Sequence, residues 1–397
     1  MKIGMFTDQF YPYISGVVTS ITMLYDELTS LGHSVYIFTS LDEKKIAKCD
    51  KIKKYNYVNL PGRPYPFKDL RDYRYTLNPN KSVKIIKKYN LDIIHVHTEF
   101  NVGKIARAAS KKLHIPVVHT LHTLYEDYLK YVSPFFDKHF HNFMFKYLAK
   151  KYIRSISRAS TIQIVPTKKV YDLASRYYMD GDIRIVPTGI DLDTFSSEQF
   201  TTKQISDLKA SLGIPKGKFV YGYIGRTSRE KTIDIIIRAF TKLNNDNSVL
   251  LIVGGGPQLE GLKELAKELN YSDKIIFTDF IERENVPIYY QLCDIFVNAS
   301  TSETQGLTYV ESLASSLPVL VQKDECLSEV IEDYYNGIYF DGEEDLVLKM
   351  KEILKAPSTL KNIKANTSKS VVKFSKEVYG KSIETIYKDA ISLYNKG

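Results

Sequence analysis

Two carboxylates and two cations in the second half of the chain have the types and spacing to hold a nucleoside diphosphate. Arg226 and Lys231 stand five residues apart after a predicted strand at 219–224, where a guanidinium and an ammonium would clamp phosphate oxygens. Glu303 lies in a turn after a later strand. Glu311 lies two turns into the next helix, where its carboxylate could accept hydrogen bonds from two ribose hydroxyls.

Two loops offer backbone amides to the same anion. The free N–H groups and the positive dipole end of a helix N-terminus attract phosphate. One such loop precedes a helix predicted near 307–316 and consists of Thr304, Gln305, Gly306 and Leu307. The other opens the helix predicted at 17–31, with Gly16 and Val17, where the missing side chain of Gly16 lets the backbone come close to a ligand.

The elements that position these residues alternate between strand and helix in both halves of the chain. The predicted strands are mostly apolar rather than alternating, which is typical of parallel strands covered by helices on both faces. In the first half they lie at 2–6, 34–38, 92–97, 116–120, 161–165 and 183–186. In the second half they lie at 219–224, 249–253, 274–277, 294–298 and 318–321. Helices are predicted at 17–31, 82–89, 232–244, 257–269, 307–316 and 373–395, and the segment 44–90 otherwise reads as loop.

This alternation predicts an α/β protein of two doubly wound domains with a cleft between them. A polar stretch at 191–217 reads as the linker. We expect domains at 1–195 and 196–372, with the helix at 373–397 crossing back to the first. Because ligands of such sheets bind outside the carboxyl ends of the strands, the loops of both domains should point into the cleft.

Composition excludes several classes of protein. The chain has 397 residues, 44% hydrophobic and 25% charged, which is ordinary for globular domains and unlike disordered or fibrous chains. No run approaches 18 apolar residues, and the opening residues read as a strand rather than as a secretory signal. Three cysteines, odd in number and without metal-ligand spacing, predict a reduced, cytoplasmic setting.

Other ligand motifs are incomplete. The glycines at 254–256 follow a strand, but the third glycine of a dinucleotide fingerprint falls on Leu259, and no P-loop is present. Four histidines lie at two neighbouring strand ends. Each pair is expected to point in different directions, and no carboxylate completes a known spacing, so no metal site is predicted. These histidines are His95, His97, His119 and His122.

Positive charge gathers in two segments of the first half. The formal net charge is +9; residues 44–88 hold 14 basic and 3 acidic side chains, and residues 130–169 hold 9 basic side chains against Asp137 alone. A biased genome could produce such composition without any function. The second segment, however, mixes aromatic and basic side chains in a way typical of an amphipathic helix in an anionic lipid interface. Its candidates are Lys130, Phe135, Phe136, Lys138, Lys146, Lys150 and Lys151.

The chain resembles the retaining glycosyltransferases of family 4, which have the GT-B fold of two facing Rossmann-like domains. The resemblance runs almost from end to end and rests on 15–17, 119–122, 187–191, Gly225-Arg226…Lys231, 254–257 and Glu303…Glu311. It implies a nucleotide-sugar donor bound mainly by the second domain and an acceptor bound by the first. By the same resemblance Arg226 and Lys231 hold the diphosphate, Glu311 binds ribose, Glu303 lies against the transferred sugar, and His122 lies near its reacting face.

One departure from the family narrows the resemblance. Where the family commonly has Glu-Gly-Phe-Gly, this chain has Glu303-Thr304-Gln305-Gly306, and with 97–100 and 122–128 that variant resembles the bacterial diacylglycerol glucosyltransferases. It implies UDP-glucose as donor, diacylglycerol as acceptor, and peripheral attachment to an anionic membrane at its cytoplasmic face. No protein-bound cofactor is expected, and a response of assays to Mg²⁺ would come through lipid or substrate. Glu99 and Asp127 are candidates to handle the acceptor hydroxyl.

Three other readings stay open at this point. The acceptor could be a polyprenol, an inositol lipid or a soluble sugar. A nucleotide-sugar epimerase could use the same scaffold, although the Arg226 and Lys231 pair favours transfer. A non-catalytic protein could bind membrane or nucleic acid through the basic half, but Glu303 and Glu311 would then have no purpose, so no nucleic-acid partner is expected.

Overall fold

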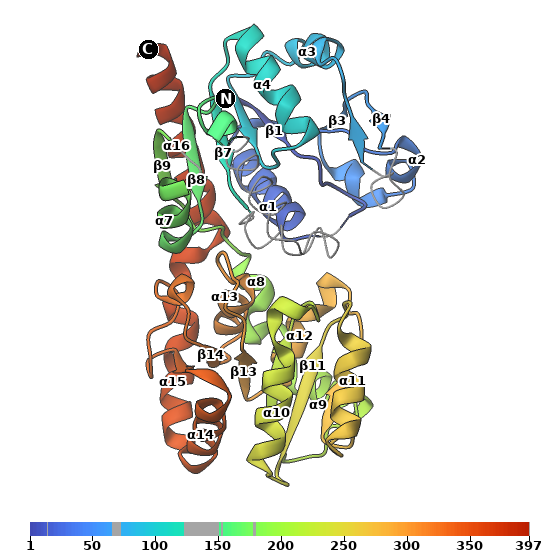
Figure 1. The fold of residues 1–397 in the computed structure, drawn as a ribbon, viewed down its shortest axis with the longest axis vertical. Helices are drawn as coiled ribbons and strands as arrows, with labels where there is room; N and C mark the ends of the chain where they lie inside the picture. Colours follow the sequence, from blue (N-terminus) through green and yellow to red (C-terminus); the bar gives the residue numbers. More distant parts are fainter. Residues whose placement is uncertain (14, 66–72, 123–150, 152–153, 178–179, 397) are drawn as a thin grey trace, which may run out of the picture. The chain divides into compact units, whose positions relative to one another are not determined.

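The computed structural model describes the chain apart from residues 14, 66–72, 123–150, 152–153, 178–179 and 397 (Figure 1). The described residues form two compact units. The first comprises Met1–Gly189 together with Lys376–Gly397, and the second comprises Ile190–Ser375. The last helix therefore belongs to the unit that also holds the N-terminus. The division falls a few residues before the boundary at 195 expected from the sequence.

The first unit is built on a seven-stranded sheet in the order β3-β2-β1-β6-β7-β8-β9. Its paired strands run parallel, and the order reverses between β1 and β6. This is the strand order of a Rossmann sheet with one strand added, in which ligands bind at the reversal point. The strands are β1 (Lys2–Phe6), β2 (Ser34–Thr39), β3 (Tyr57–Asn59), β6 (Ile93–Val96), β7 (Val117–Thr120), β8 (Ile162–Val165) and β9 (Asp182–Ile185). A separate antiparallel pair joins β4 (Arg63–Pro64) to β5 (Arg74–Tyr75).

Helices cover both faces of this sheet. One apolar core lies under α1 (Gly16–Ser30) and α16 (Lys376–Lys396), and the other under α3 (Asn80–Lys87) and α4 (Asn101–Leu113). Because all four residues of β6 are buried, the strand has apolar side chains toward both cores. The helices α1 and α16 pack together in Figure 1, although they lie at opposite ends of the sequence. Other helices of the unit whose bounds the structure describes are α2 (Glu43–Ile46), η1 (Asp50–Lys54) and α7 (Lys168–Tyr177).

The second unit repeats this architecture on a six-stranded sheet in the order β12-β11-β10-β13-β14-β15. All five strand pairings are parallel, and the order reverses between β10 and β13. We therefore expect its ligand site at the carboxyl ends of these two strands. The strands are β10 (Phe219–Ile224), β11 (Ser248–Val253), β12 (Ile275–Phe277), β13 (Ile295–Asn298), β14 (Val319–Gln322) and β15 (Gly337–Phe340).

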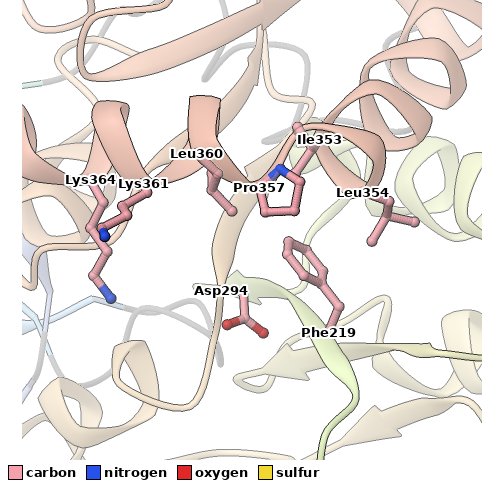
Figure 2. A pocket seen from close by; sticks show the side chains of 8 residues that line it. All are labelled: Phe219, Asp294, Ile353, Leu354, Pro357, Leu360, Lys361 and Lys364. Atoms are coloured by element: carbon pink, nitrogen blue, oxygen red, sulfur yellow. The ribbon is translucent and has the colours of Figure 1, made fainter.

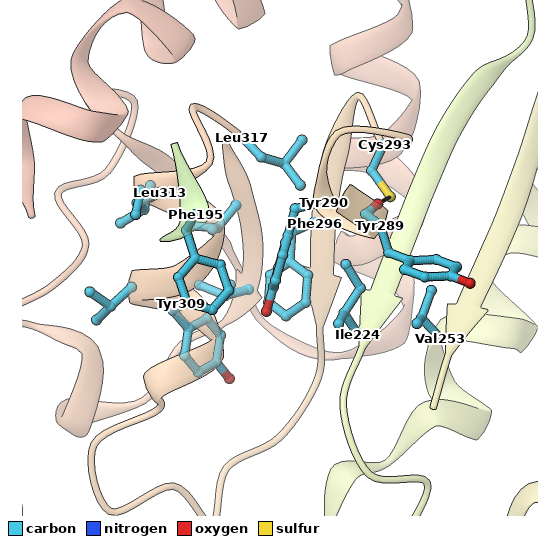
Figure 3. Close-up of a cluster of buried hydrophobic side chains, with 14 of the residues drawn as sticks. Phe195, Ile224, Val253, Tyr289, Tyr290, Cys293, Phe296, Tyr309, Leu313 and Leu317 are labelled. Atoms are coloured by element: carbon cyan, nitrogen blue, oxygen red, sulfur yellow. Dashed lines mark hydrogen bonds between the residues drawn. The ribbon is translucent and has the colours of Figure 1, made fainter. Parts of the chain in front are cut away.

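Two apolar cores flank this second sheet. Figure 3 shows part of one, in which Phe195, Tyr290, Phe296 and Tyr309 gather beside Ile224. The other lies under the helices α10, α11 and α14. The helices of the unit are α8 (Leu192–Phe195), η3 (Ser197–Gln199), α9 (Thr202–Ser211), η4 (Arg229–Lys231), α10 (Ile233–Leu243), α11 (Leu259–Glu268), η5 (Arg283–Asn285), α12 (Val286–Tyr290), α13 (Leu307–Ala314), η6 (Glu325–Leu327), α14 (Gly342–Lys355), α15 (Pro357–Ser370) and η7 (Val372–Phe374).

The structure corrects two expectations about local structure. The polar stretch at 191–217 is not a linker but folds as α8, η3 and α9, because Ile205, Leu208 and Leu212 recur at helical spacing and pack on the second unit's core. The segment 44–90, expected to be loop apart from one helix, also holds η1, β3, β4 and β5. Each of these strands is only two or three residues long, so it carries almost no pattern. Within the described ranges, none of the helices combines the length and apolar character that crossing a bilayer requires.

Candidate functional site

The glycine-rich loop after β11 serves a close approach of two backbones. The N–H of Thr227, in the loop after β10, donates to the Gly255 carbonyl at 3.0 Å. Gly254 has a φ of 125°, and a Cβ there would collide with the Gly225 carbonyl oxygen. Glycine is therefore required at 254 by the contact between the loops after β10 and β11.

One cation and the first carboxylate of the predicted site meet in the segments that follow β10 and β13. Lys231 ends η4, and its Nζ lies 2.6 Å from Oε1 of Glu303, in the loop after β13. The side chains of both residues are mostly buried, with exposed fractions of 22% and 12%. Arg226 lies two residues after the end of β10 and is exposed. The neighbouring Thr232 fixes this arrangement, because its hydroxyl donates to the Ala299 carbonyl at 2.7 Å.

The amides predicted to bind phosphate lie beside these charges. Helix α13 begins at Leu307, and no side chain caps its N-terminus. Gly306 stands at the N-cap with a φ of 74°, and a Cβ there would collide with the ring of Tyr309. Glycine is therefore needed for the sharp entry into α13, while Thr304 and Gln305 occupy the loop before it.

The second carboxylate, Glu311, is almost fully buried on α13 and is held by two donors from the neighbouring segment. The hydroxyl of Tyr290 donates to its Oε2 at 2.9 Å, and Arg283 donates from Nη2 to Oε1 and from Nη1 to Oε2, the latter at 3.3 Å. Burial raises the pKa of Tyr290, so the phenol stays a neutral donor. The nearby carboxylate raises the pKa of Arg283.

The sequence analysis missed Arg283. It is one arginine in the polar segment 278–285, between β12 and α12, and no spacing links it to Glu311. The only available signal was its position after a strand of the second sheet, at the edge where the other site residues also lie.

In the first unit, three of the four histidines at the strand ends contact one another in a row. His95 and His97 stand on and after β6 with ring centroids 4.0 Å apart, and His97 Nδ1 lies 3.1 Å from His122 Nε2. His95 bonds to Tyr387 of α16 and to Thr120 of β7, each at 2.7 Å. The expectation that each pair points in different directions is therefore wrong for β6, because residues two apart in a strand share a face.

Burial controls the charge of these histidines. It lowers the pKa of His122 to about 4 and the pKa values of His95 and His97 well below their usual range. His122 is therefore a neutral imidazole at pH 7. Among the described residues, no group of three or more histidine, cysteine or acidic side chains is arranged to hold a metal ion.

Acidic groups line the same edge of the first sheet. Glu99, a predicted acceptor residue, is buried and its Oε1 lies 3.0 Å from His119 Nε2. Asp8, which the sequence analysis missed, accepts hydrogen bonds from the Val102 N–H at 3.0 Å and the Thr98 hydroxyl at 2.7 Å. Burial raises the pKa of Asp8 to about 6.

One backbone N–H group at the N-terminus of α1 is hydrogen-bonded to the side chain of the N-cap residue. The Ser15 hydroxyl oxygen accepts from the Val18 N–H at 3.3 Å and donates to Gln9 Oε1 at 3.0 Å. Gly16 is exposed, and a Cβ there would meet no atom within 4 Å, while Val17 is half-buried. The amides expected to be free at this helix end therefore do not include that of Val18.

The comparisons with known proteins agree with this architecture. The family model "Glycosyltransferase Family 4" matches residues 14–194, and the model "Glycosyl transferases group 1" matches residues 204–370. The alpha-monoglucosyldiacylglycerol synthase of Acholeplasma laidlawii is 39% identical over 398 residues, covering 100% of this chain and 99% of that protein. The chain belongs to glycosyltransferase family 4.

A second relative in this family is the alpha-monoglucosyldiacylglycerol synthase of Streptococcus pneumoniae, 37% identical over 98% of this chain and 86% of its own length. Among solved structures, a glycosyltransferase from Rickettsia africae has a TM-score of 0.78 at 19% identity, covering 98% of each chain. Anabaena HepE, crystallised in complex with UDP-glucose, has a TM-score of 0.74 at 17% identity, covering 98% of this chain and 100% of its own. The chain is a glycosyltransferase of the GT-B fold.

The predicted site residues are divided between the regions that the two family models match. Arg226, Lys231, Glu303 and Glu311 fall in the second region, and Gly16, Glu99 and His122 fall in the first. Lys151 is described and exposed on a helix. The other acceptor and membrane candidates lie outside the described residues, namely Asp127, Lys130, Phe135, Phe136, Lys138, Lys146 and Lys150.

A pocket of the second unit lies away from these residues. Figure 2 shows it beside Phe219, which begins β10, and Asp294, which precedes β13, so it lies at the amino ends of these strands. Its volume is about 260 Å³, and its other lining residues are Ile353, Leu354, Pro357, Leu360, Lys361 and Lys364. It includes none of the predicted site residues.

Proposed function

We propose that this chain is a retaining hexosyltransferase that moves glucose from UDP-glucose to the free hydroxyl of 1,2-diacylglycerol, at the cytoplasmic face of the membrane. The observation that carries the proposal is the 39% identity, over the whole length of both chains, to an alpha-monoglucosyldiacylglycerol synthase. The arrangement of charged side chains in the second unit supports it, because it suits a nucleoside diphosphate sugar.

The donor is assigned to the carboxyl edge of the second sheet. Arg226, Lys231 and the uncapped N-terminus of α13 would hold the diphosphate. These groups are positively charged or carry a positive partial charge, and the diphosphate gains negative charge as its bond to the sugar breaks. Glu311 would accept a hydrogen bond from a ribose hydroxyl. Glu303, already beside Lys231, would lie against the glucose.

The reaction exchanges one bond for another at the anomeric carbon. The bond between C1 of glucose and the β-phosphate oxygen breaks, the glycerol oxygen bonds to C1 from the same face, and UDP takes up the hydroxyl proton. Since His122 is neutral at pH 7, we assign it a hydrogen bond at the reacting face of the sugar rather than a positive charge. Glu99 is assigned to the acceptor side.

Membrane attachment is assigned to the basic first half. Residues 44–88 and 130–169 hold the surplus of positive charge, and each lysine or arginine near an anionic surface contributes about 1 kcal/mol of attraction. The attachment would be peripheral and would weaken as salt rises, because the charges are screened.

The decisive experiment uses the full chain with radiolabelled UDP-glucose and vesicles that contain diacylglycerol and a varied fraction of anionic lipid. The proposal predicts an alpha-glucosyl lipid whose rate of formation rises with anionic lipid content. UDP-galactose, GDP-glucose and ADP-glucose test the donor, and free sugars, polyprenol and inositol lipids test the acceptor.

Each alternative has a separate outcome in that experiment. Transfer to another acceptor with none to diacylglycerol would overturn the acceptor assignment, and a new nucleotide sugar formed without any acceptor would indicate an epimerase. A rate that does not depend on vesicle charge would contradict the membrane assignment alone.

A further inference from the structure

We propose that Arg283 is a positioning residue of the donor site, whose guanidinium holds the buried Glu311 carboxylate as an oriented anion that accepts a hydrogen bond from a ribose hydroxyl of the nucleotide. The inference rests on the proposed UDP-sugar site, and it adds a residue that comes from a different element than the glutamate through which it acts.

The contact between the two side chains is a fork. Two guanidinium nitrogens of Arg283 each donate to a different oxygen of Glu311, Nη2 to Oε1 and Nη1 to Oε2. A planar guanidinium that pairs with both oxygens fixes the plane of the carboxylate, which a point charge such as an ammonium does not do. Arg283 therefore sets the direction in which the remaining acceptor positions of Glu311 point.

Arg283 is itself held in place. Its Cζ lies 5.4 Å from the centroid of the Phe195 ring, so the guanidinium stands over an aromatic face of the second unit's core. Tyr290, from α12, donates to Glu311 Oε2 at 2.9 Å and buttresses the carboxylate from the side. Oε2 accordingly accepts two hydrogen bonds and Oε1 accepts one, which leaves an acceptor position on Oε1 for a ligand.

Burial makes this pairing necessary. Glu311 is 2% exposed, and a carboxylate so far removed from water is costly unless a counter-charge accompanies it. A neutral acid would offer one donor and a weaker acceptor in place of two strong acceptor oxygens. Without Arg283 the residue would therefore lose its preference for a hydroxyl donor such as ribose O2′.

The test measures binding of UDP and of 2′-deoxy-UDP to the full chain by titration calorimetry, so it needs neither acceptor nor membrane. The wild-type protein should bind 2′-deoxy-UDP about tenfold or more weakly than UDP, because a hydrogen bond to a charged group is lost. In Arg283→Met the affinity for UDP should fall about tenfold, and the preference for UDP over 2′-deoxy-UDP should shrink to less than about twofold. Arg283→Lys should give an intermediate preference.

A double-mutant cycle separates this role from a structural one. Glu311→Gln should lose the same preference, and Arg283→Met should have no further effect on it in that background. Arg238→Met, which changes an exposed arginine on α10, should behave as the wild type. Thermal unfolding of each variant shows whether it is folded, and Arg283→Lys carries the test if Arg283→Met is not.

The outcomes are distinct. If Arg283→Met weakens both nucleotides equally and keeps the wild-type preference, Arg283 is only structural and the inference is overturned. It is also overturned if the wild type does not distinguish the two nucleotides. If the preference for UDP over 2′-deoxy-UDP is lost in the Arg283 and Glu311 variants, but the protein transfers no glucose to diacylglycerol, the inference stands and the proposed function fails. If the wild type binds no UDP, both fail.

Discussion

The ammonium of Lys231 lies 2.6 Å from the carboxylate of Glu303, so the cation assigned to the diphosphate is paired with the carboxylate assigned to the sugar before any donor binds. Both side chains are mostly buried, which makes their attraction stronger than that of a surface pair. A diphosphate that enters this site must share or replace Glu303 as the partner of Lys231.

Glu303→Gln should therefore separate binding from turnover. Removal of the competing charge should leave the affinity for UDP unchanged or raise it by up to about tenfold, whereas glucosyl transfer should fall by about 10²–10³ because a charged group at the reacting sugar is lost. Calorimetry with UDP and transfer assays measure the two effects. Glu282→Gln, at an exposed position, is the control, and weaker UDP binding by Glu303→Gln would contradict the competition.

Arg226→Ala should lower kcat/KM by about 10²–10³, because we propose that its charge acts on the leaving group. The free energy of unfolding should change by less than about 0.5 kcal/mol, since the side chain is exposed. Urea unfolding and transfer kinetics check both parts. Arg229→Ala removes an exposed arginine three residues away and should leave both quantities as in the wild type. Equal losses in the two variants would show a general effect of charge rather than a specific contact.

Gly306→Ala should destabilise the protein by about 1–3 kcal/mol, because a φ of 74° is strained for alanine and its Cβ would collide with the Tyr309 ring. Gly261→Ala is the matched control. It lies inside α11 with no atom within 4 Å of an added Cβ, and there alanine should stabilise the protein by about 0.5–1 kcal/mol. Urea unfolding measures both changes, and a neutral Gly306→Ala would show that the loop rearranges freely.

His122 should make the protein less stable in acid. Its pKa is about 4 in the folded protein against 6.5 as the ordinary value, so between these values the unfolded chain binds the proton more strongly. The stability that neutral His122 contributes is present above pH 6.5 and is lost as the pH falls toward 4. The free energy of unfolding of His122→Gln should therefore fall less than that of the wild type between pH 7 and pH 4.5, and parallel curves would contradict the buried neutral imidazole.

Asp8 should act in the opposite direction. Its pKa is about 6 in the folded protein against 3.8 as the ordinary value, so the folded state binds the proton more strongly in that interval. The stability it contributes is present below pH 3.8 and is lost as the pH rises through 6. Asp8→Asn should therefore gain stability relative to the wild type as the pH increases from 4.5 to 7, which the same urea series measures; a constant difference would argue against the raised pKa.

Much of the fold follows from local pattern. The strands β1, β6 and β10 are short apolar runs followed by polar loops, and such runs are typical of buried parallel strands. β3 escaped prediction because its three half-buried residues have no distinct pattern. The helix at 202–211 escaped prediction because most of its residues are polar. The helical spacing of its few apolar residues indicates a helix only once a core is known to lie beside it.

The sequence by itself determined which chemistry this chain carries: a guanidinium, an ammonium and two carboxylates at the ends of strands, in the order of family 4. Only the tertiary structure decided which charges are partners. Lys231 meets Glu303 across 72 residues, and Arg283, which follows β12, meets Glu311, on the helix after β13, across 28 residues. The physical reason is that parallel strands bring their carboxyl ends to one edge, so loops far apart in sequence become neighbours, and burial there turns each unpaired charge into a cost that a specific partner must offset.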